Sequence, residues 1–397
     1  MSAAAAALLL AATALVIGVV HARRAERAAV HALAPQMFAL KAQGLALQRA
    51  AVHAPDLLPF YGSSDLKTPN RFHASALFRD YPTEFTVFPV AQLGATSLIW
   101  LQALAANGAD LRDRQVAVSV AAHGFLSETV DGHAYAANFS ALHAGELAFS
   151  PRLSFDLKSA VARRLLAYPE TLTGDPLLRA ALELLADGSI ASHVAYDALL
   201  PLGWLRNAAL RLQDHWRALA FLRAQVGLAA GPRQAAALDW RALGERADDA
   251  TRRAASGNPF GVDAAVWATR GPDMTRQRDR FTADSARLAV ERSEEWTDLA
   301  LLLRVAGELG ARPLLLAIPM HAPYHDHLGV PAAVRDAQAR RLRALAAAHG
   351  AALADFADHN AAVPFTTDAT AHLSDAGWVR YDRALDAFVH HRPAGGS

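Results

Sequence analysis

The stretch Leu57-Leu58-Pro59-Phe60-Tyr61-Gly62-Ser63-Ser64-Asp65 joins a short apolar run to a turn of small and polar residues. An apolar run that ends in Gly-Ser is typical of a buried strand that presents a hydroxyl group at its carboxyl end. Far along the chain, Asp368-Ala369-Thr370-Ala371-His372 offers a carboxylate and an imidazole. If the two segments meet in space, they supply a nucleophile, a base and a group that orients the base.

Four further apolar runs have the length of strands, and helical patterns separate several of them. They cover residues 85–90, 115–122, 314–319 and 351–356. Strands that alternate with helices predict an α/β fold with a parallel sheet covered by helices on both faces. Functional residues in such folds lie beyond the carboxyl ends of the strands. Five residues follow predicted strands or precede the last helix, and we expect them near one edge of the sheet: Gly62, Gly94, His123, His321 and His372.

The composition excludes several classes of function. Hydrophobic residues make up 53% and charged residues 19% of the 397 residues, as in a globular protein, and the length predicts two lobes or one decorated domain. The net charge of +1 gives no sign of nucleic-acid binding. The chain has no cysteine, which excludes thiol catalysis, disulfides and cysteine-based zinc sites. The Gly-x-Ser-x-Gly, phosphate-loop, His-Glu-x-x-His and dinucleotide-binding motifs are also absent from the sequence.

The N-terminal segment AAAAALLLAATALVIGVV, residues 3–20, is apolar and uncharged. Its length is just below the roughly 20 residues that cross a bilayer without tilt. We interpret residues 1–22 as an uncleaved signal anchor; a signal peptide cleaved after Val20-His21-Ala22 and a buried core helix are the alternatives. Arg23, Arg24 and Arg27 follow the segment, and the positive-inside rule alone would place that side in the cytoplasm. A start codon further upstream would remove this conflict.

The rest of the chain divides by its pattern of apolar residues. Helical spacing over residues 25–56 predicts an N-terminal helix or stalk, assigned to residues 23–56, and residues 57–397 form the α/β domain. Within that domain, residues from about 155 to 290 have helical patterns and no strand. We interpret this part as a helical insertion, with helices expected at 158–168, 176–186, 190–203, 204–226 and 233–254.

Each candidate site also has a structural interpretation. The Gly62-Ser63-Ser64 turn either presents a nucleophile, with backbone N–H groups beside it, or simply caps a helix. Asp368 and His372 either form a catalytic pair or stabilise one helical turn. The segment His321-Ala-Pro-Tyr-His325-Asp326-His327 has enough ligands for a metal, but contact with substrate at the sheet edge is the favoured interpretation.

Several segments together resemble one family. The block Phe60–Asp65 is followed by Phe72-His73-Ala74-Ser75, and Leu93-Gly94-Ala95-Thr96-Ser97-Leu98 forms a second block. Two central landmarks are Gly257-Asn258-Pro259-Phe260-Gly261 and Ser293-Glu294-Glu295-Trp296-Thr297-Asp298-Leu299, and the last are residues 319–329 and His372-Leu373-Ser374-x-x-Gly377-Trp378. These segments resemble the DltD family of membrane-anchored proteins, which complete the D-alanylation of cell-surface polymers. The resemblance covers nearly the whole chain.

The resemblance implies a three-layer α/β/α fold like that of SGNH hydrolases, with Ser64 as the nucleophile and His372 as the base. Gly94 and Ser64 would give backbone N–H groups to an oxyanion, while His123 and His321 would line the site. The family has its acid three residues before the histidine, where this chain has Ala369. Asp368 therefore serves if the loop bulges; otherwise Asp355 or Asp358 replaces it, or the site is a Ser-His dyad.

The resemblance also implies a function. The body would lie outside the cytoplasmic membrane, in the periplasm of a Gram-negative cell, on a single anchor helix. It would transfer D-alanyl groups to teichoic acid or lipopolysaccharide through a seryl acyl-enzyme, without metal or cofactor, and so weaken the binding of cationic antimicrobial peptides. A D-alanyl carrier or a membrane-bound acyltransferase would be its partner. An esterase or thioesterase of the same fold, a non-catalytic scaffold and a glycan O-acetyltransferase remain alternatives.

Overall fold

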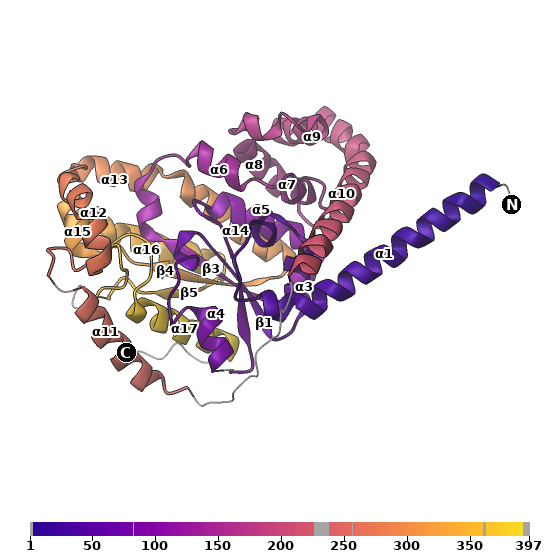
Figure 1. The fold of residues 1–397 in the computed structure, drawn as a ribbon. Coiled ribbons are helices and arrows are strands. Elements are labelled where there is room, and N and C mark those ends of the chain that lie inside the picture. The colour runs from indigo at the N-terminus through magenta and orange to yellow at the C-terminus, as the bar shows by residue number, and fades with distance from the viewer. Residues whose placement is uncertain (1–2, 82, 226–237, 256, 360–362, 392–397) are drawn as a thin grey trace.

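The computed structural model describes residues 3–81, 83–225, 238–255, 257–359 and 363–391. In these residues one parallel sheet has five strands in the order β2-β1-β3-β4-β5 (Figure 1). They are β1 (Leu57–Gly62), β2 (Thr86–Ala91), β3 (Gln115–Ala121), β4 (Arg312–Ile318) and β5 (Ala352–Asp355). All five predicted strands are confirmed, and their ends differ from the prediction by two residues at most.

Side chains of each strand alternate between two apolar layers. In β1, Leu57 and Tyr61 join one layer, and Leu58 and Phe60 join the other. Helices α3 (Ala46–His53), α5 (Ser97–Asn107), α14 (Glu294–Leu309) and α16 (Ala332–Ala348) contribute to the first layer. Helices α4 (Ala74–Asp80), α11 (Trp240–Ala254) and α17 (Asp375–Val389) contribute to the second. The expected three-layer α/β/α arrangement is therefore confirmed.

The order of the strands determines where a site can form. The chain passes from β1 to its neighbour β2 and then returns to the other side of β1 to form β3. In such sheets a crevice opens beyond the carboxyl ends of the two strands where the direction of winding reverses. The segments that follow β1 and β3, which contain Ser64 and His123, therefore meet at one crevice.

The N-terminal part differs from the prediction of one helix over residues 25–56. It forms α1 (Ala3–Leu33), α2 (Ala39–Gln43) and α3. Helix α1 ends two residues before Pro35, because proline cannot donate the backbone hydrogen bond that would continue the helix. Gly44, in extended backbone, ends α2. Helix α1 is long and apolar enough to cross a membrane, and it continues without a break past residue 22 into the body.

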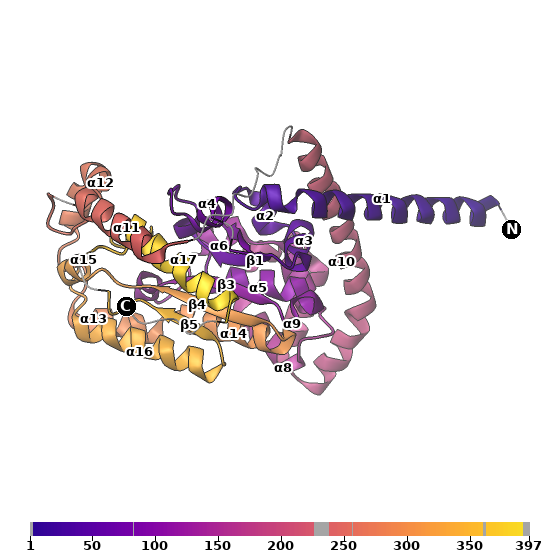
Figure 2. The same cartoon turned by 90° about the horizontal axis from the view of Figure 1, so that it is seen from below.

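Helix α1 leaves the body on one side, and α15 (Ala322–His327), which follows β4, lies on the opposite side (Figures 1 and 2). The carboxyl ends of the parallel strands therefore point away from the projecting part of α1. The predicted crevice lies on that far side.

Only helices connect β3 and β4 in the described residues. After a short 3₁₀ helix come α6 (Gly132–Asn138), α7 (Ala141–Ala148), α8 (Phe155–Leu165), α9 (Pro176–Asp187), α10 (Ile190–Ala224), α11, α12 (Ala264–Arg276), α13 (Ala283–Arg292) and α14. They lie on different parts of the body: α10 packs on α1 and α9, whereas α11 packs on α17 (Figure 1). Residues 226–237, with the start of the helix predicted at 233, lie outside the described residues.

The two helices predicted at 190–203 and 204–226 are instead one helix, α10. Gly203 suggested a break, but it lies in the helix interior against the ring of Phe149. A Cβ atom at Gly203 would lie 2.2 Å from Phe149 Cδ1. This glycine permits close packing and does not end the helix.

Candidate active site

The Ser64 turn follows β1 directly. Ser64 begins a 3₁₀ helix, Ser64–Leu66, and the backbone N–H of Ser63 donates to Asp65 Oδ1 at 2.6 Å. The Ser63 hydroxyl donates to the carbonyl of Gln92 at 3.3 Å, whereas within the described residues no hydrogen bond occupies the Ser64 hydroxyl. Of the two serines, Ser64 has the freer hydroxyl group.

His73 holds the turn from the other side. Its Nε2 donates to the Leu66 carbonyl at 2.9 Å, and its Nδ1 accepts from the Ser75 backbone at the start of α4. Burial lowers the pKa of His73 to about 4, so the ring is neutral at physiological pH. The Phe72–Ser75 motif thus ties the 3₁₀ helix of Ser64 to the next α-helix.

Asp368 and His372 form a hydrogen-bonded pair. His372 Nδ1 donates to Asp368 Oδ2 at 2.8 Å. Asp368 Oδ1 accepts the backbone N–H groups of Thr370, Ala371 and His372 at 3.0–3.1 Å. Ala369, the residue after Asp368, has φ +63°, in the left-handed region. With this backbone the Asp368 carboxylate reaches both the ring and the backbone N–H of His372.

The pair perturbs both of its pKa values. Burial alone would raise the pKa of Asp368, but the hydrogen bond and charge of His372 hold it well below its ordinary value. The hydrogen bond to Asp368 raises the pKa of His372, and the charge of Asp65 raises it further.

The alternative acids have other surroundings. Asp355 forms an ion pair with Arg343, and its Oδ1 accepts the backbone N–H of Ala357. Asp355 and Asp358 line a separate cavity. No hydrogen bond joins either carboxylate to His372 in the described residues, so Asp368 is the acid that the geometry favours.

A cavity of about 330 Å³ lies in the crevice beyond β1 and β3. Ser64, Gly94 and His123 line it together, with Thr370 and Ala371 from the loop that carries His372. The lining comes from six segments: the Ser64 turn, the Gly94 loop with the start of α5, the end of β3, the segment before α6, the start of α14 and the His372 loop. The structure therefore brings the distant segments to one place.

Gly94 has φ +71°, which favours glycine, and a Cβ atom there would lie 3.0 Å from that of Ala134.

No hydrogen bond joins the Ser64 hydroxyl to His372 in the described structure. Proton transfer between them needs a change of side-chain rotamer or a bridging water, and such contacts are often loose in the absence of substrate.

The other two histidines named from the sequence differ in position. His123 lines the Ser64 cavity, and its Nδ1 lies 3.2 Å from Nε2 of His325. His321 lines a neighbouring cavity, and its ring donates to the carbonyl of Phe260. His325 and His327 donate to the carbonyls of His321 and Thr275. The three rings of the His-rich segment thus face separate carbonyls, and no group of three potential metal ligands is found among the described residues.

Sequence reasoning gave no role to Glu295, which lines the cavity at the start of α14. Its Oε1 accepts from the Ser97 hydroxyl at 2.5 Å and from the Ser97 backbone at 3.1 Å. Burial raises the pKa of Glu295 to about 7. Two successive acids at the start of a helix were the available signal. Only the packing of α14 on α5 places one of them beside the Gly94 loop.

Replacement of Glu295 by leucine tests this contact. Leucine fills a similar volume but accepts no hydrogen bond, so the hydroxyl and backbone N–H of Ser97 lose their acceptor. The start of α5 should then shift and weaken any oxyanion donor at Gly94. We expect turnover to fall roughly 10- to 100-fold, the effect of about 1–3 kcal/mol in a buried hydrogen bond. The measurement is a double-mutant cycle with Ser97→Ala. Additive effects would show that Glu295 does not act through Ser97.

The fold defines the chain as an α/β protein with the three-layer arrangement of SGNH hydrolases. A family model described as DltD protein matches residues 34–390. The Protein DltD of Bacillus subtilis (strain 168) is 28% identical over 362 residues, which cover 90% of this chain and 87% of that protein. The Protein DltD of Staphylococcus aureus (strain NCTC 8325 / PS 47) is 20% identical over 351 residues, with 88% and 85% covered. That of Lacticaseibacillus rhamnosus is 22% identical over 372 residues, with 92% and 85% covered.

The chain therefore belongs to the DltD family. Proteins of this family take part in the D-alanylation of teichoic acids. The resemblance read from the sequence is confirmed over most of the chain.

Proposed function

We propose that this protein transfers D-alanyl groups to a glycopolymer of the cell envelope through an acyl-enzyme on Ser64. The Asp368–His372 hydrogen bond carries the proposal, because it lies in the loop whose Thr370 and Ala371 line the same cavity as Ser64. A histidine oriented by a buried carboxylate can accept a serine proton and stabilise its own positive charge. We choose the D-alanyl group as the acyl group because the chain belongs to a family that takes part in D-alanylation.

The reaction has two halves. In the first, His372 Nε2 takes the proton of Ser64, and Oγ attacks the carbonyl carbon of a D-alanyl thioester or ester. The bond to the leaving sulfur or oxygen breaks, and His372 returns the proton to the leaving group. In the second, an acceptor hydroxyl gives its proton to His372 and attacks the D-alanyl-Ser64 ester. Ser64 then recovers the proton.

The tetrahedral oxyanion of each half needs donors. We assign this role to the backbone N–H groups of Gly94 and Ser64, because both residues line the cavity and backbone donors need no reorganisation during the reaction. Glu295 holds Ser97, three residues after Gly94. His123 would contact the substrate, whereas His321 would act only through the neighbouring His325.

The proposed setting is the outer face of the cytoplasmic membrane, with α1 as a single anchor. A D-alanyl carrier or a membrane-bound acyltransferase would donate the acyl group, and teichoic acid or lipopolysaccharide would accept it. Added D-alanyl amines reduce the negative charge of the envelope and its attraction for cationic peptides. The site lies away from the projecting part of α1, which suits a polymer acceptor that extends from the membrane.

Two alternatives are retained. In an esterase or thioesterase, water would replace the acceptor hydroxyl at the same acyl-enzyme. The other alternative is a scaffold for the D-alanylation proteins, in which Ser64 would form no acyl-enzyme.

Incubation of the purified protein with a D-alanyl thioester tests the proposal. We expect intact-mass spectrometry to detect one D-alanyl adduct, and peptide mapping to locate it on Ser64. Replacement of His372 by alanine should prevent the adduct, because the proposed base for the Ser64 proton is then missing. An adduct on another residue, or none under conditions of active turnover, would contradict the acyl-enzyme.

A further inference from the structure

Helix α10 has an exposed apolar face. Five large side chains of this face are 46–87% exposed: Ile190, Val194, Leu202, Leu205 and Trp216. At 100° per residue they lie on one side of the helix. The buried positions Tyr196, Gly203, Asn207 and Asp214 lie on the opposite side, toward the body. We call these five exposed residues the outer face of α10.

The outer face of α10 meets the apolar part of α1. A Cβ atom on Gly18 would lie 3.3 Å from the ring of Trp216, so Trp216 rests against the last turns of the apolar segment 3–20. Helix α10 runs across α1, on the side of the body from which α1 projects (Figure 2). If α1 spans a bilayer, α10 lies along its surface, at the depth where the apolar segment ends. Tryptophan favours that depth in membrane proteins.

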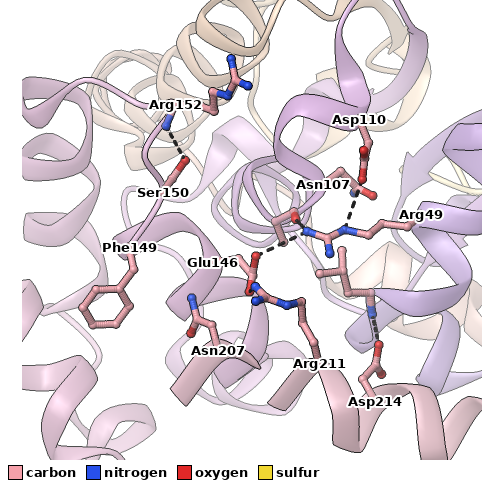
Figure 3. Close-up of polar contacts among 12 residues, drawn as sticks. Arg49, Asn107, Asp110, Glu146, Phe149, Ser150, Arg152, Asn207, Arg211 and Asp214 are labelled. Carbon is pink, nitrogen blue, oxygen red and sulfur yellow. Dashed lines mark hydrogen bonds and ion pairs between the residues drawn. The ribbon is translucent and has the colours of Figure 1, made fainter. Parts of the chain in front are cut away.

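Positive charge gathers between the two helices. A cavity of about 470 Å³ there is lined by five arginines, Arg23, Arg27, Arg49, Arg152 and Arg211, and by three acids, Glu26, Asp110 and Glu146. Arg49 pairs with Asp110 and Glu146, and Arg211 also pairs with Glu146 (Figure 3). The excess of arginine beside an apolar face complements a bilayer with anionic head groups.

We propose that the outer face of α10 is a membrane-contact surface. It lies in the head-group region of an anionic bilayer beside α1, and the exposed Arg23 and Arg27 of α1 face lipid phosphates. This inference rests on the anchor role of α1 in the proposed function. Two contacts with the bilayer fix the tilt of the body, which one helix alone does not. The crevice with Ser64 is then turned away from the membrane.

The absence of cysteine from the sequence permits a direct test with single spin labels. Three variants of the full chain are reconstituted in vesicles of phosphatidylcholine and phosphatidylglycerol: Leu205→Cys on α10, Val16→Cys on α1 and Ala268→Cys on α12. All three positions are exposed, so the label should not disturb folding. Collisions of the label with oxygen report lipid, and collisions with a water-soluble nickel complex report solvent.

We expect the labels at Val16 and Leu205 to favour oxygen and the label at Ala268 to favour nickel. A solvent-exposed label at Leu205 with a lipid-exposed label at Val16 would overturn the inference and leave the anchor intact. Spin–spin broadening at Leu205 would indicate a second copy on this face, which also overturns it. A solvent-exposed label at Val16 would remove the anchor and the inference together. None of these outcomes depends on acyl transfer, so failure here is distinct from failure of the enzymatic proposal.

The charge contribution has its own comparison. In vesicles of phosphatidylcholine alone the label at Leu205 should lie shallower, and Arg23→Gln with Arg27→Gln should produce the same shift in the anionic vesicles. Equal depth in both lipids would contradict a role for the arginines.

Discussion

Replacement of Ser64 by alanine is expected to abolish D-alanyl transfer. The alanine side chain lacks the oxygen that forms the acyl-enzyme, and removal of a serine nucleophile lowers turnover by roughly 10⁴- to 10⁶-fold in serine enzymes. Fold stability should change little, because in the described residues the Ser64 hydroxyl makes no hydrogen bond. The loss would therefore report chemistry and not unfolding.

Ser63→Ala is the matched control. Ser63 carries the same hydroxyl group as Ser64, is its neighbour in sequence, and donates a hydrogen bond to the Gln92 carbonyl. Its loss should cost about 1 kcal/mol of stability or less and leave most of the activity. The measurement is the D-alanine ester content of the envelope in cells with equal amounts of each variant. Normal ester content with Ser64→Ala would refute the acyl-enzyme and support the scaffold.

The strands were predictable because each buried parallel strand is a short run of apolar residues bounded by polar or small ones. The run at β1 ends in Gly-Ser-Ser, and the carboxyl end of a parallel strand places Ser64 at the crevice whatever the helices do. The ends of helices were harder to predict, because a glycine can either end a helix or allow another side chain to pack closely against it. Gly203 resembled a helix end in sequence, yet it packs against Phe149. Pro35 and Gly44, in contrast, do separate helices.

The candidate site was predictable only in part. His372 and Ser64 belong to local motifs, but the hydrogen bond of Asp368 depends on the left-handed backbone of Ala369, which sequence does not specify. Glu295 has a role only through the contact of α14 with α5. His321 was expected at the same site, but the helix after β4 turns its ring toward Phe260. Tertiary contacts, not local pattern, decide these three cases.

Replacement of Asp368 by asparagine is the second large effect that we expect. The asparagine amide accepts the Nδ1 proton of His372 less strongly than the carboxylate does, and it favours the tautomer of His372 that carries its proton on Nε2. The corresponding change in a serine protease lowers turnover about 10⁴-fold. Asp355→Asn is the matched control, since Asp355 pairs with Arg343 and not with His372. Its activity should stay near that of the unchanged protein. A large loss with Asp355→Asn and none with Asp368→Asn would reassign the acid.

The pH dependence separates orientation from simple damage. His372 must be neutral to act as a base, and its raised pKa places the acid limb of kcat/KM above the ordinary histidine value of about 6.5. In Asp368→Asn that limb should move to lower pH, while the plateau falls.

The stability of the fold should also depend on pH, because both pKa values differ between the folded and the unfolded chain. The lowered pKa of Asp368 adds stability above about pH 4, lost as pH falls further, and the raised pKa of His372 adds stability below about pH 6.5, lost as pH rises. The pair thus stabilises the fold most between these values, and Asp368→Asn should flatten that maximum in urea titrations. In the pH profile of kcat/KM, an acid limb that does not move in Asp368→Asn would mean that another group sets the pKa of the base.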